Sequence, residues 1–110
     1  MFEGGQPLVD IFVYGTLLDD GLVVQLTGRR FPRCAAQLRG YRKHTPAGSY
    51  PYVVPDDNGV VEGVVLREID SEALRALDEY EDEGQLYRCI EVTITVAGWP
   101  QRAFVYASAK

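Results

Sequence analysis

The sequence has little of what metal and cofactor chemistry usually requires. Its 110 residues contain one histidine, His44, and two cysteines, Cys34 and Cys89, neither of which belongs to a C-x-x-C pattern. Zinc sites in proteins draw most of their ligands from clusters of histidine and cysteine, so we expect neither a metal site nor a cofactor. Two cysteines also exclude a dense disulfide framework, and we expect both to be reduced, partly buried thiols.

Positive charge and long apolar runs are scarce as well. The chain has 11 Lys and Arg residues against 16 Asp and Glu residues, which makes its net charge −5. Nucleic-acid binding depends on a basic surface, and we interpret the small basic cluster between Arg29 and Lys43 as a solvated strand edge. No apolar run approaches the ~18 residues that span a bilayer, and residues 1–6 do not resemble a signal peptide. We therefore expect a cytoplasmic protein, monomeric or weakly dimeric, that binds neither nucleic acid nor membranes.

Length and composition predict a single domain over residues 1–110. The apolar fraction of 46% and the charged fraction of 25% are those of an ordinary globular protein. A chain of this length cannot hold a cofactor domain beside a substrate domain. An enzyme of this size must therefore build its site on one scaffold.

The pattern of apolar residues predicts five or six strands and two short helices. The expected strands lie near residues 8–14, 31–43, 60–69, 86–96 and 102–107, and the expected helices near residues 21–26 and 72–80. Prolines and glycines in residues 45–58 predict a loop with little regular pairing, and Asp57-Asn58-Gly59 predicts a tight turn. These elements indicate an α+β fold with a curved mixed sheet that can close on itself.

Local features add detail to these elements. Residues 8–14 are almost continuously apolar, which is typical of a strand buried on both faces. An aspartate in residues 19–20 and a polar side chain in residues 70–71 are expected to cap the two helices. Gly63 lies inside a predicted strand, where it indicates a bulge or a close approach of another backbone.

One carboxylate of the acidic segment 78–83 lies where an apolar side chain is expected. An α-helix turns ~100° per residue, so Glu81 shares a face with Leu77, four residues earlier. That face consists of Ala73, Leu74, Leu77 and Tyr80. A carboxylate persists there when the helix has already ended, when it is paired, or when it acts as an acid or base. Asp78 lies at the border of the face, and we interpret it as a hydrogen-bonding residue of the helix end.

The segment Tyr14-Gly15-Thr16-Leu17-Leu18 follows the first predicted strand. A glycine there lets successive backbone N–H groups turn outward, and such groups bind an anion or stabilise an oxyanion. Many strands end in glycine, so this turn alone indicates little. Together with an inward carboxylate it provides two parts of an acyl-transfer site.

Four motifs along the chain form a recognisable set. They are Val13-Tyr14-Gly15-Thr16-Leu17, Tyr50-Pro51 followed by Val54-Pro55, Val61-Glu62-Gly63, and Leu77-Asp78-Glu79-Tyr80-Glu81 followed by Tyr87. In this order and spacing they resemble the YG[ST]L loop, the YP…VP segment, the V-x-G strand and the LDxxE…Y motif of the γ-glutamylcyclotransferase-like family. The resemblance includes the family's plant avirulence-induced-gene branch and covers nearly the whole chain.

The resemblance implies a small closed or nearly closed mixed β-barrel with short flanking helices and a pocket for a γ-glutamyl group. It implies that Glu81 is the catalytic general acid/base and that the YGTL loop is the anion or oxyanion site. The predicted substrate-binding residues are Tyr14, Gly15, Thr16, Leu17, Tyr50, Tyr87 and Tyr106. For each of the last three, a core or rim aromatic is the alternative interpretation.

The sequence departs from the family pattern at two positions. Asp82 follows Glu81 where the family often has glycine. Cys89 stands where the family often has arginine, and Arg88, one residue earlier, is expected on the other face of the strand. The role of that arginine is therefore not carried over to this chain.

The reaction that the resemblance implies is an intramolecular aminolysis of transferase or lyase type. The α-amine of a γ-glutamyl substrate attacks its own γ-carbonyl, which yields 5-oxoproline and releases an amine without metal or cofactor. The alternative is a non-catalytic protein of the same fold that binds a small carboxylate, and a protein-interaction adaptor is a third class. Glu81 favours catalysis, because a receptor for an anion would not place a second negative charge in its pocket.

Overall fold

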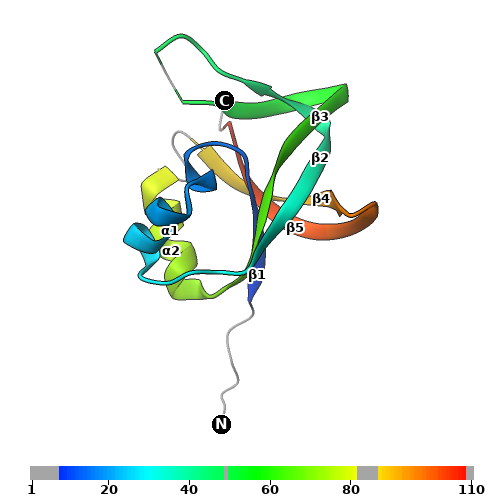
Figure 1. Cartoon of the computed structure of the whole chain (residues 1–110). Helices are drawn as coiled ribbons and strands as arrows, with labels where there is room; N and C mark the ends of the chain where they lie inside the picture. Colours follow the sequence, from blue (N-terminus) through cyan, green and yellow to red (C-terminus); the bar gives the residue numbers. More distant parts are fainter. Residues whose placement is uncertain (1–7, 49, 82–86, 109–110) are drawn as a thin grey trace.

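Strand and helix positions follow the sequence pattern over most of the chain. The computed structural model describes residues 8–48, 50–81 and 87–108. The elements are β1 (Val9–Val13), the single 3-10 turn η1 (Thr16–Leu18), α1 (Asp20–Thr27), β2 (Arg33–His44), β3 (Tyr52–Ile69), α2 (Ser71–Glu81), β4 (Tyr87–Val96) and β5 (Trp99–Ser108) (Figure 1).

The strands close into a barrel in the order β1-β3-β2-β4-β5. β1 pairs antiparallel with β3 and parallel with β5, so this short strand both closes the sheet and makes it mixed. β4 and β5 form the predicted hairpin, from Tyr87 opposite Ser108 to Val96 opposite Trp99. The predicted α+β fold with a small closed mixed barrel is confirmed.

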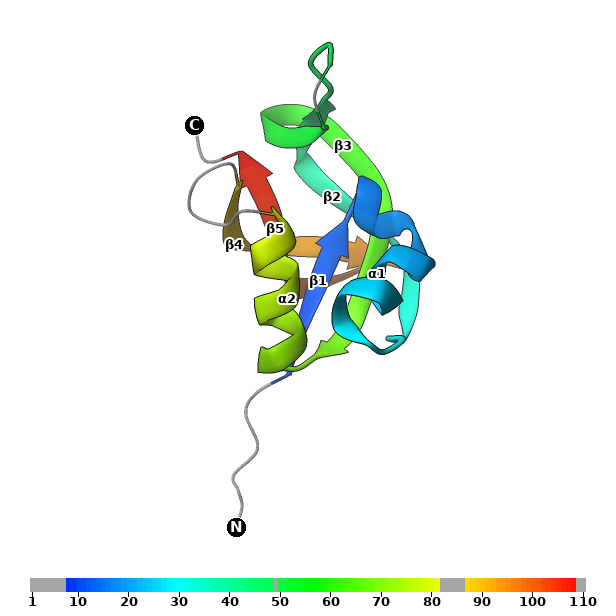
Figure 2. The ribbon, with the colours of Figure 1, turned by 90° about the vertical axis from the view of Figure 1, so that its left-hand side faces the viewer.

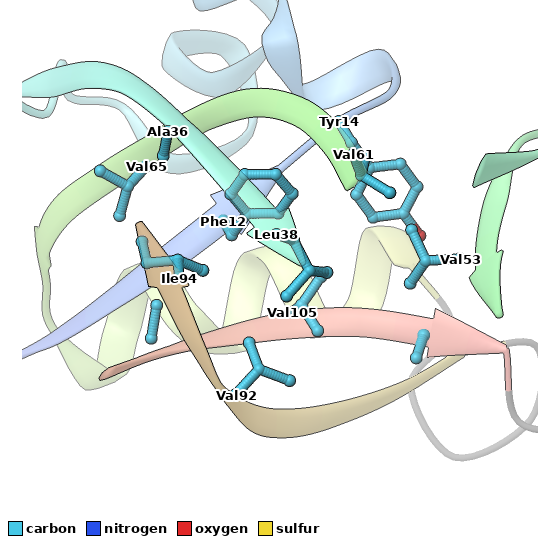
Figure 3. Close-up of a cluster of buried hydrophobic side chains, with 12 residues drawn as sticks. Phe12, Tyr14, Ala36, Leu38, Val53, Val61, Val65, Val92, Ile94 and Val105 are labelled. Atoms are coloured by element: carbon cyan, nitrogen blue, oxygen red, sulfur yellow. The ribbon is translucent and has the colours of Figure 1, made fainter. Parts of the chain in front are cut away.

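Side chains of β1 alternate between the barrel interior and the space beneath the helices. Phe12 and Tyr14 belong to the cluster inside the barrel (Figure 3). Ile11 and Val13 pack outside it, in a second cluster that includes Leu77 of α2. Figure 2 shows α1 and α2 flanking β1 over the outer face of the barrel. β1 is therefore buried on both faces, as predicted from its continuous apolar sequence.

The predicted loop over residues 45–58 is wrong for its second half. β3 begins at Tyr52 and pairs with the end of β2, from His44 opposite Tyr52 to Tyr41 opposite Pro55. Within the described ranges, β2 is the only strand that pairs with this part of β3, and proline is tolerated on such an edge because it has no N–H to donate. The two strands therefore extend beyond the barrel as a two-stranded arm (Figure 1).

The predicted tight turn at Asp57-Asn58-Gly59 is a bulge inside β3. The pairing shifts from Tyr41 opposite Pro55 to Arg39 opposite Val60, so the chain bulges without reversing. A Cβ atom on Gly59 would lie 2.1 Å from the Tyr41 carbonyl oxygen, so only glycine fits here. The residue types indicate irregular backbone correctly, but they do not distinguish a bulge from a reversal.

Other local predictions are confirmed. The Asp19 side chain accepts a hydrogen bond from the Gly21 N–H at 2.9 Å, and the Asp70 side chain accepts one from Ala73 at 2.9 Å, so both helices are capped. A Cβ atom on Gly63 would lie 2.3 Å from the Val13 carbonyl oxygen, which is the predicted close approach of another backbone. Cys34 and Cys89 are both half-buried, as predicted.

Ion pairs occupy much of the basic cluster. Arg29 lies 2.5 Å from Asp70, and Asp20 contacts both Arg30 and Arg33. These pairs join the N-terminal ends of the two helices to residues 29–33, which include the start of β2. In the described ranges, no helix is long and apolar enough to cross a membrane.

Candidate active site

A cavity of about 170 Å³ lies where the end of β1, the end of α2, the start of β4 and residues 50–51 meet. Every residue predicted for the site contributes to its wall. The lining residues are Phe12, Val13, Tyr14, Gly15, Thr16, Leu17, Tyr50, Pro51, Tyr80, Glu81, Tyr87 and Tyr106. The structure therefore brings together on one cavity side chains from distant parts of the sequence, such as Tyr14 and Tyr106, whose positions differ by 92 residues.

The loop after β1 forms one wall of the cavity. Gly15 precedes the single turn η1, in which the Leu18 N–H donates to the Gly15 carbonyl at 3.0 Å. The N–H groups of Thr16 and Leu17 precede this first bond, so they have no partner within the turn. A Cβ atom on Gly15 would lie 3.2 Å from Cγ of Pro51, so glycine lets the loop approach the opposite wall closely.

Glu81 is the last residue of α2 and is half-buried at the cavity. On the same helix face, Ala73 and Leu77 are buried. Because α2 includes Glu81, helix termination alone does not explain its inward place. Within the described residues no hydrogen bond or ion pair satisfies its carboxylate, and burial raises its pKa from the ordinary 4.5 to about 7.

The tyrosines at the cavity have different exposures. The Tyr106 side chain is 1% exposed and its hydroxyl donates to Oδ1 of Asp78 at 2.6 Å, while Tyr50, 66% exposed, lies at the rim. The Tyr87 hydroxyl donates to the Pro51 carbonyl at 3.1 Å, which joins β4 to the segment before β3. Tyr106 is thus both a core and a wall residue, Tyr50 is a rim residue, and Asp78 accepts a hydrogen bond near the helix end as predicted.

The cavity is an acidic site bordered by phenol groups. Burial is the main cause that raises the pKa of the Tyr14, Tyr87 and Tyr106 hydroxyls, and the nearby negative charge of Glu81 adds to it in each case. None of the described side chains that line the cavity is basic. The Lys43 ammonium is not part of the lining, and it donates a hydrogen bond to the Tyr14 carbonyl at 3.4 Å.

Sequence reasoning missed several of these participants. Tyr80 was expected on the apolar face, yet it is 37% exposed and its hydroxyl donates to Oγ1 of Thr16 at 2.9 Å. Its position directly before Glu81 was the available signal. Pro51 could have been found from the Tyr50-Pro51 motif. Lys43 could not, because only the pairing of β2 with β3 brings this lysine to the loop.

The positions that depart from the family pattern lie as their alternation predicts. Arg88 is exposed on β4, while Cys89 packs in the cluster between the barrel and the helices. Asp82 and the glycine at position 84 lie outside the described residues. Among the side chains that are described, no three of His, Cys, Asp or Glu gather as metal ligands would.

Comparison with known sequences identifies relatives over most of the chain. A family model described as gamma-glutamyl cyclotransferase, AIG2-like, matches residues 11–110. AIG2-like protein C of Arabidopsis thaliana is 36% identical over 92 residues, which cover 83% of this chain and 54% of that protein. AIG2-like protein D of the same plant is 36% identical over 95 residues, covering 84% and 62%. The chain spans about half the length of the curated relatives it matches.

Solved structures share the fold. A solution structure of an Arabidopsis thaliana protein superposes with a TM-score of 0.85 at 26% identity, covering 98% of this chain and 72% of that one. A structure described as gamma-glutamyl cyclotransferase superposes with a TM-score of 0.80 at 20% identity, covering 94% and 68%, which supports the fold alone. By its sequence and its barrel, this chain belongs to the gamma-glutamyl cyclotransferase, AIG2-like family.

Proposed function

We propose that this chain is a γ-glutamylcyclotransferase-type enzyme that converts a γ-glutamyl group to 5-oxoproline and releases an amine or amino acid. One observation carries the proposal. Glu81 is a half-buried carboxylate without a partner among the described residues, and it borders the same cavity as the Gly15–Leu17 backbone. A base and an anion site on one small cavity are what an intramolecular aminolysis requires.

In the proposed reaction the substrate carries its own nucleophile. The α-amine attacks the γ-carbonyl carbon, a carbon–nitrogen bond forms within a five-membered ring, and the bond to the leaving nitrogen breaks. The α-amine loses a proton and the leaving amine gains one, so atoms and charge balance without water. Holding the α-amine close to the γ-carbonyl in the correct orientation can lower the activation free energy of ring closure by up to ~7–11 kcal/mol.

Glu81 is the proposed carrier of that proton. A free α-amino group has a pKa of ~8, and a base is most effective when its own pKa lies near the working pH. Burial brings the pKa of Glu81 to about 7, close to both. Glu81 would accept the proton from the amine and then donate it to the leaving nitrogen.

The loop and the tyrosines have the remaining proposed roles. Backbone N–H groups of Gly15, Thr16 and Leu17 would hold the substrate carboxylate or the oxyanion. Tyr14, Tyr87 and Tyr106 would shape the dry part of the pocket, and Tyr50 its rim. The alternative is a non-catalytic protein that binds a small carboxylate in the same cavity.

A panel of γ-glutamyl compounds tests the proposal. It comprises glutathione, γ-glutamyl amino acids and γ-glutamyl-lysine amines, with release of 5-oxoproline measured. Wild type is expected to act on at least one compound, and Glu81→Gln to lose ~100-fold or more of that turnover. Glu79→Gln removes an exposed carboxylate from the same helix turn and serves as the matched control, which should keep its activity.

Two results would overturn parts of this assignment. Near-normal turnover by Glu81→Gln would remove Glu81 as the base. No release from any compound by wild type, combined with saturable binding of 5-oxoproline or glutarate in calorimetry, would favour the carboxylate-binding alternative.

A further inference from the structure

Tyr106 is bonded at both of its ends to elements that carry the site. Its hydroxyl donates to Oδ1 of Asp78 on α2 at 2.6 Å. Its main-chain carbonyl accepts a hydrogen bond from the Tyr14 hydroxyl at 2.5 Å. A single residue of β5 therefore connects the helix that bears Glu81 with the strand that leads into the Gly15 loop.

The anchor is rigid on the side of the barrel. The Tyr106 side chain is 1% exposed and packs in the cluster between the barrel and the helices, beside Leu77. Closely packed side chains of this kind do not shift without repacking their neighbours. A hydrogen bond to a carboxylate is also stronger than one between neutral groups. The last turn of α2 is therefore bonded to a closely packed part of the molecule.

Glu81 needs such an anchor because of its place in the helix. It is the final residue of α2, and helix ends fray. Asp78 lies three residues earlier, about one turn back along the same helix. A hydrogen bond at Asp78 keeps the following turn helical, and a helical turn holds Glu81 on the inward face.

We propose that Asp78 is a positioning residue, which acts through the Tyr106 hydroxyl to hold the last turn of α2 on β5 and thereby keeps the Glu81 carboxylate at the cavity. This inference rests on the proposed role of Glu81. It goes beyond that role because it gives Asp78, one helix turn earlier, the task of positioning Glu81 and no part in proton transfer.

Among the described residues, the groups that face Glu81 come from several elements. They are the hydroxyls of Tyr14 just after β1, Tyr87 on β4 and Tyr106 on β5, with Asp78 and Tyr80 on α2 itself and Tyr50 at the rim. Tyr106→Phe removes the bond together with one neutral hydroxyl, and it leaves the Asp78 carboxylate and the other hydroxyls in place. The variant therefore separates a positional effect on Glu81 from an electrostatic one.

The first test needs no turnover. The Glu81 carboxylate is titrated by carbon-13 NMR in wild type, Tyr106→Phe, Asp78→Asn, Asp78→Ala and Tyr52→Phe. Loss of the anchor lets water reach the carboxylate, so its pKa in Tyr106→Phe should fall from about 7 by roughly one pH unit or more. If the helix end did not depend on the bond, the more apolar phenylalanine would leave this pKa unchanged or raise it, which would overturn the proposal.

The other variants control this experiment. Asp78→Asn keeps an oxygen that can accept from Tyr106, so the Glu81 pKa should fall less than in Asp78→Ala. Tyr52→Phe removes a phenol from the arm, outside the cavity, and should change nothing. Thermal unfolding of each variant shows that it is folded, and Asp78→Asn remains informative if Asp78→Ala does not fold.

The second test measures turnover of the best γ-glutamyl compound. Tyr106→Phe should lower kcat by roughly 10-fold with little change in KM, and Asp78→Ala should lower it at least as much. The double variant should be no worse than Asp78→Ala alone, because the Tyr106 hydroxyl acts through Asp78. If the kcat losses of the two single variants multiply in the double variant, the two side chains do not act through one bond, and the proposal is overturned. If wild type turns over no compound, the proposed function fails while the NMR titration still decides whether Asp78 positions Glu81.

Discussion

The Tyr80 hydroxyl donates a hydrogen bond of 2.9 Å to the Thr16 hydroxyl, 64 residues away in sequence. The bond joins the last turn of α2 to the turn that follows β1. This hydrogen bond is exposed, whereas the Tyr106–Asp78 hydrogen bond is partly buried. The helix that bears Glu81 and the loop after β1 are thus joined directly as well as through the barrel.

Tyr80→Phe should loosen the loop more than it destabilises the fold. An exposed hydrogen bond contributes ~0.5–1.5 kcal/mol, so kcat/KM should fall by up to about 10-fold, mainly through KM, with a small loss of thermal stability. Steady-state kinetics with the best γ-glutamyl compound checks this. Tyr52→Phe is the matched control, and a Tyr80→Phe variant with unchanged KM would show that the bond does not organise the loop.

Activity should depend on the ionisation of Glu81. A base must be ionised to accept a proton, and burial raises the pKa of Glu81 to about 7. Below about pH 7, kcat/KM should therefore fall approximately tenfold per pH unit. The acidic limb should coincide with the pKa measured for Glu81 by NMR. A flat profile down to about pH 5 would contradict this role for Glu81.

The same carboxylate should make stability depend on pH. Its pKa in the folded chain lies above the ordinary 4.5, so the folded state holds the proton more tightly than the unfolded state. The stability contribution of the protonated form is complete below about pH 4.5 and is lost as the pH rises through about 7. Glu81→Gln cannot ionise and should escape this loss.

Denaturant unfolding of both proteins checks the sign. The stability of Glu81→Gln relative to wild type should increase between about pH 4.5 and pH 8 and stay level below that window. Glu79→Gln should show no such trend, since that carboxylate is exposed. A relative stability that falls with rising pH would mean that ionised Glu81 is stabilised by a partner.

Gly63→Ala should destabilise the barrel. The new Cβ would lie 2.3 Å from the Val13 carbonyl oxygen and 2.7 Å from the Phe12 ring, so β1 and β3 would have to separate. Overpacking of this kind costs ~1–3 kcal/mol or more, measurable by chemical denaturation. Gly21→Ala, where the nearest atom is the Asp19 side chain at 3.3 Å, should change stability by ~1 kcal/mol or less. Equal stability of the two variants would contradict the close approach at Gly63.

Much of the site could be predicted because its signals are local. A helix repeats every ~3.6 residues, so the inward place of Glu81 follows from its spacing to Leu77. The caps and the close approach at Gly63 likewise depend on residue type within a short segment. The arm of β2 and β3 could not be predicted, because the same prolines and glycines suit a loop, a reversal or a bulged strand.

The sequence by itself determined the elements, the burial of β1 on both faces and the direction in which Glu81 points. These properties follow from the periodicity of each segment, which the chain carries without reference to distant residues. Only the tertiary structure decided the partners: Thr16 for Tyr80, Asp78 for Tyr106 and the Tyr14 carbonyl for Lys43. Those contacts depend on the order in which strands pair when the barrel closes, and that order is a property of the whole chain.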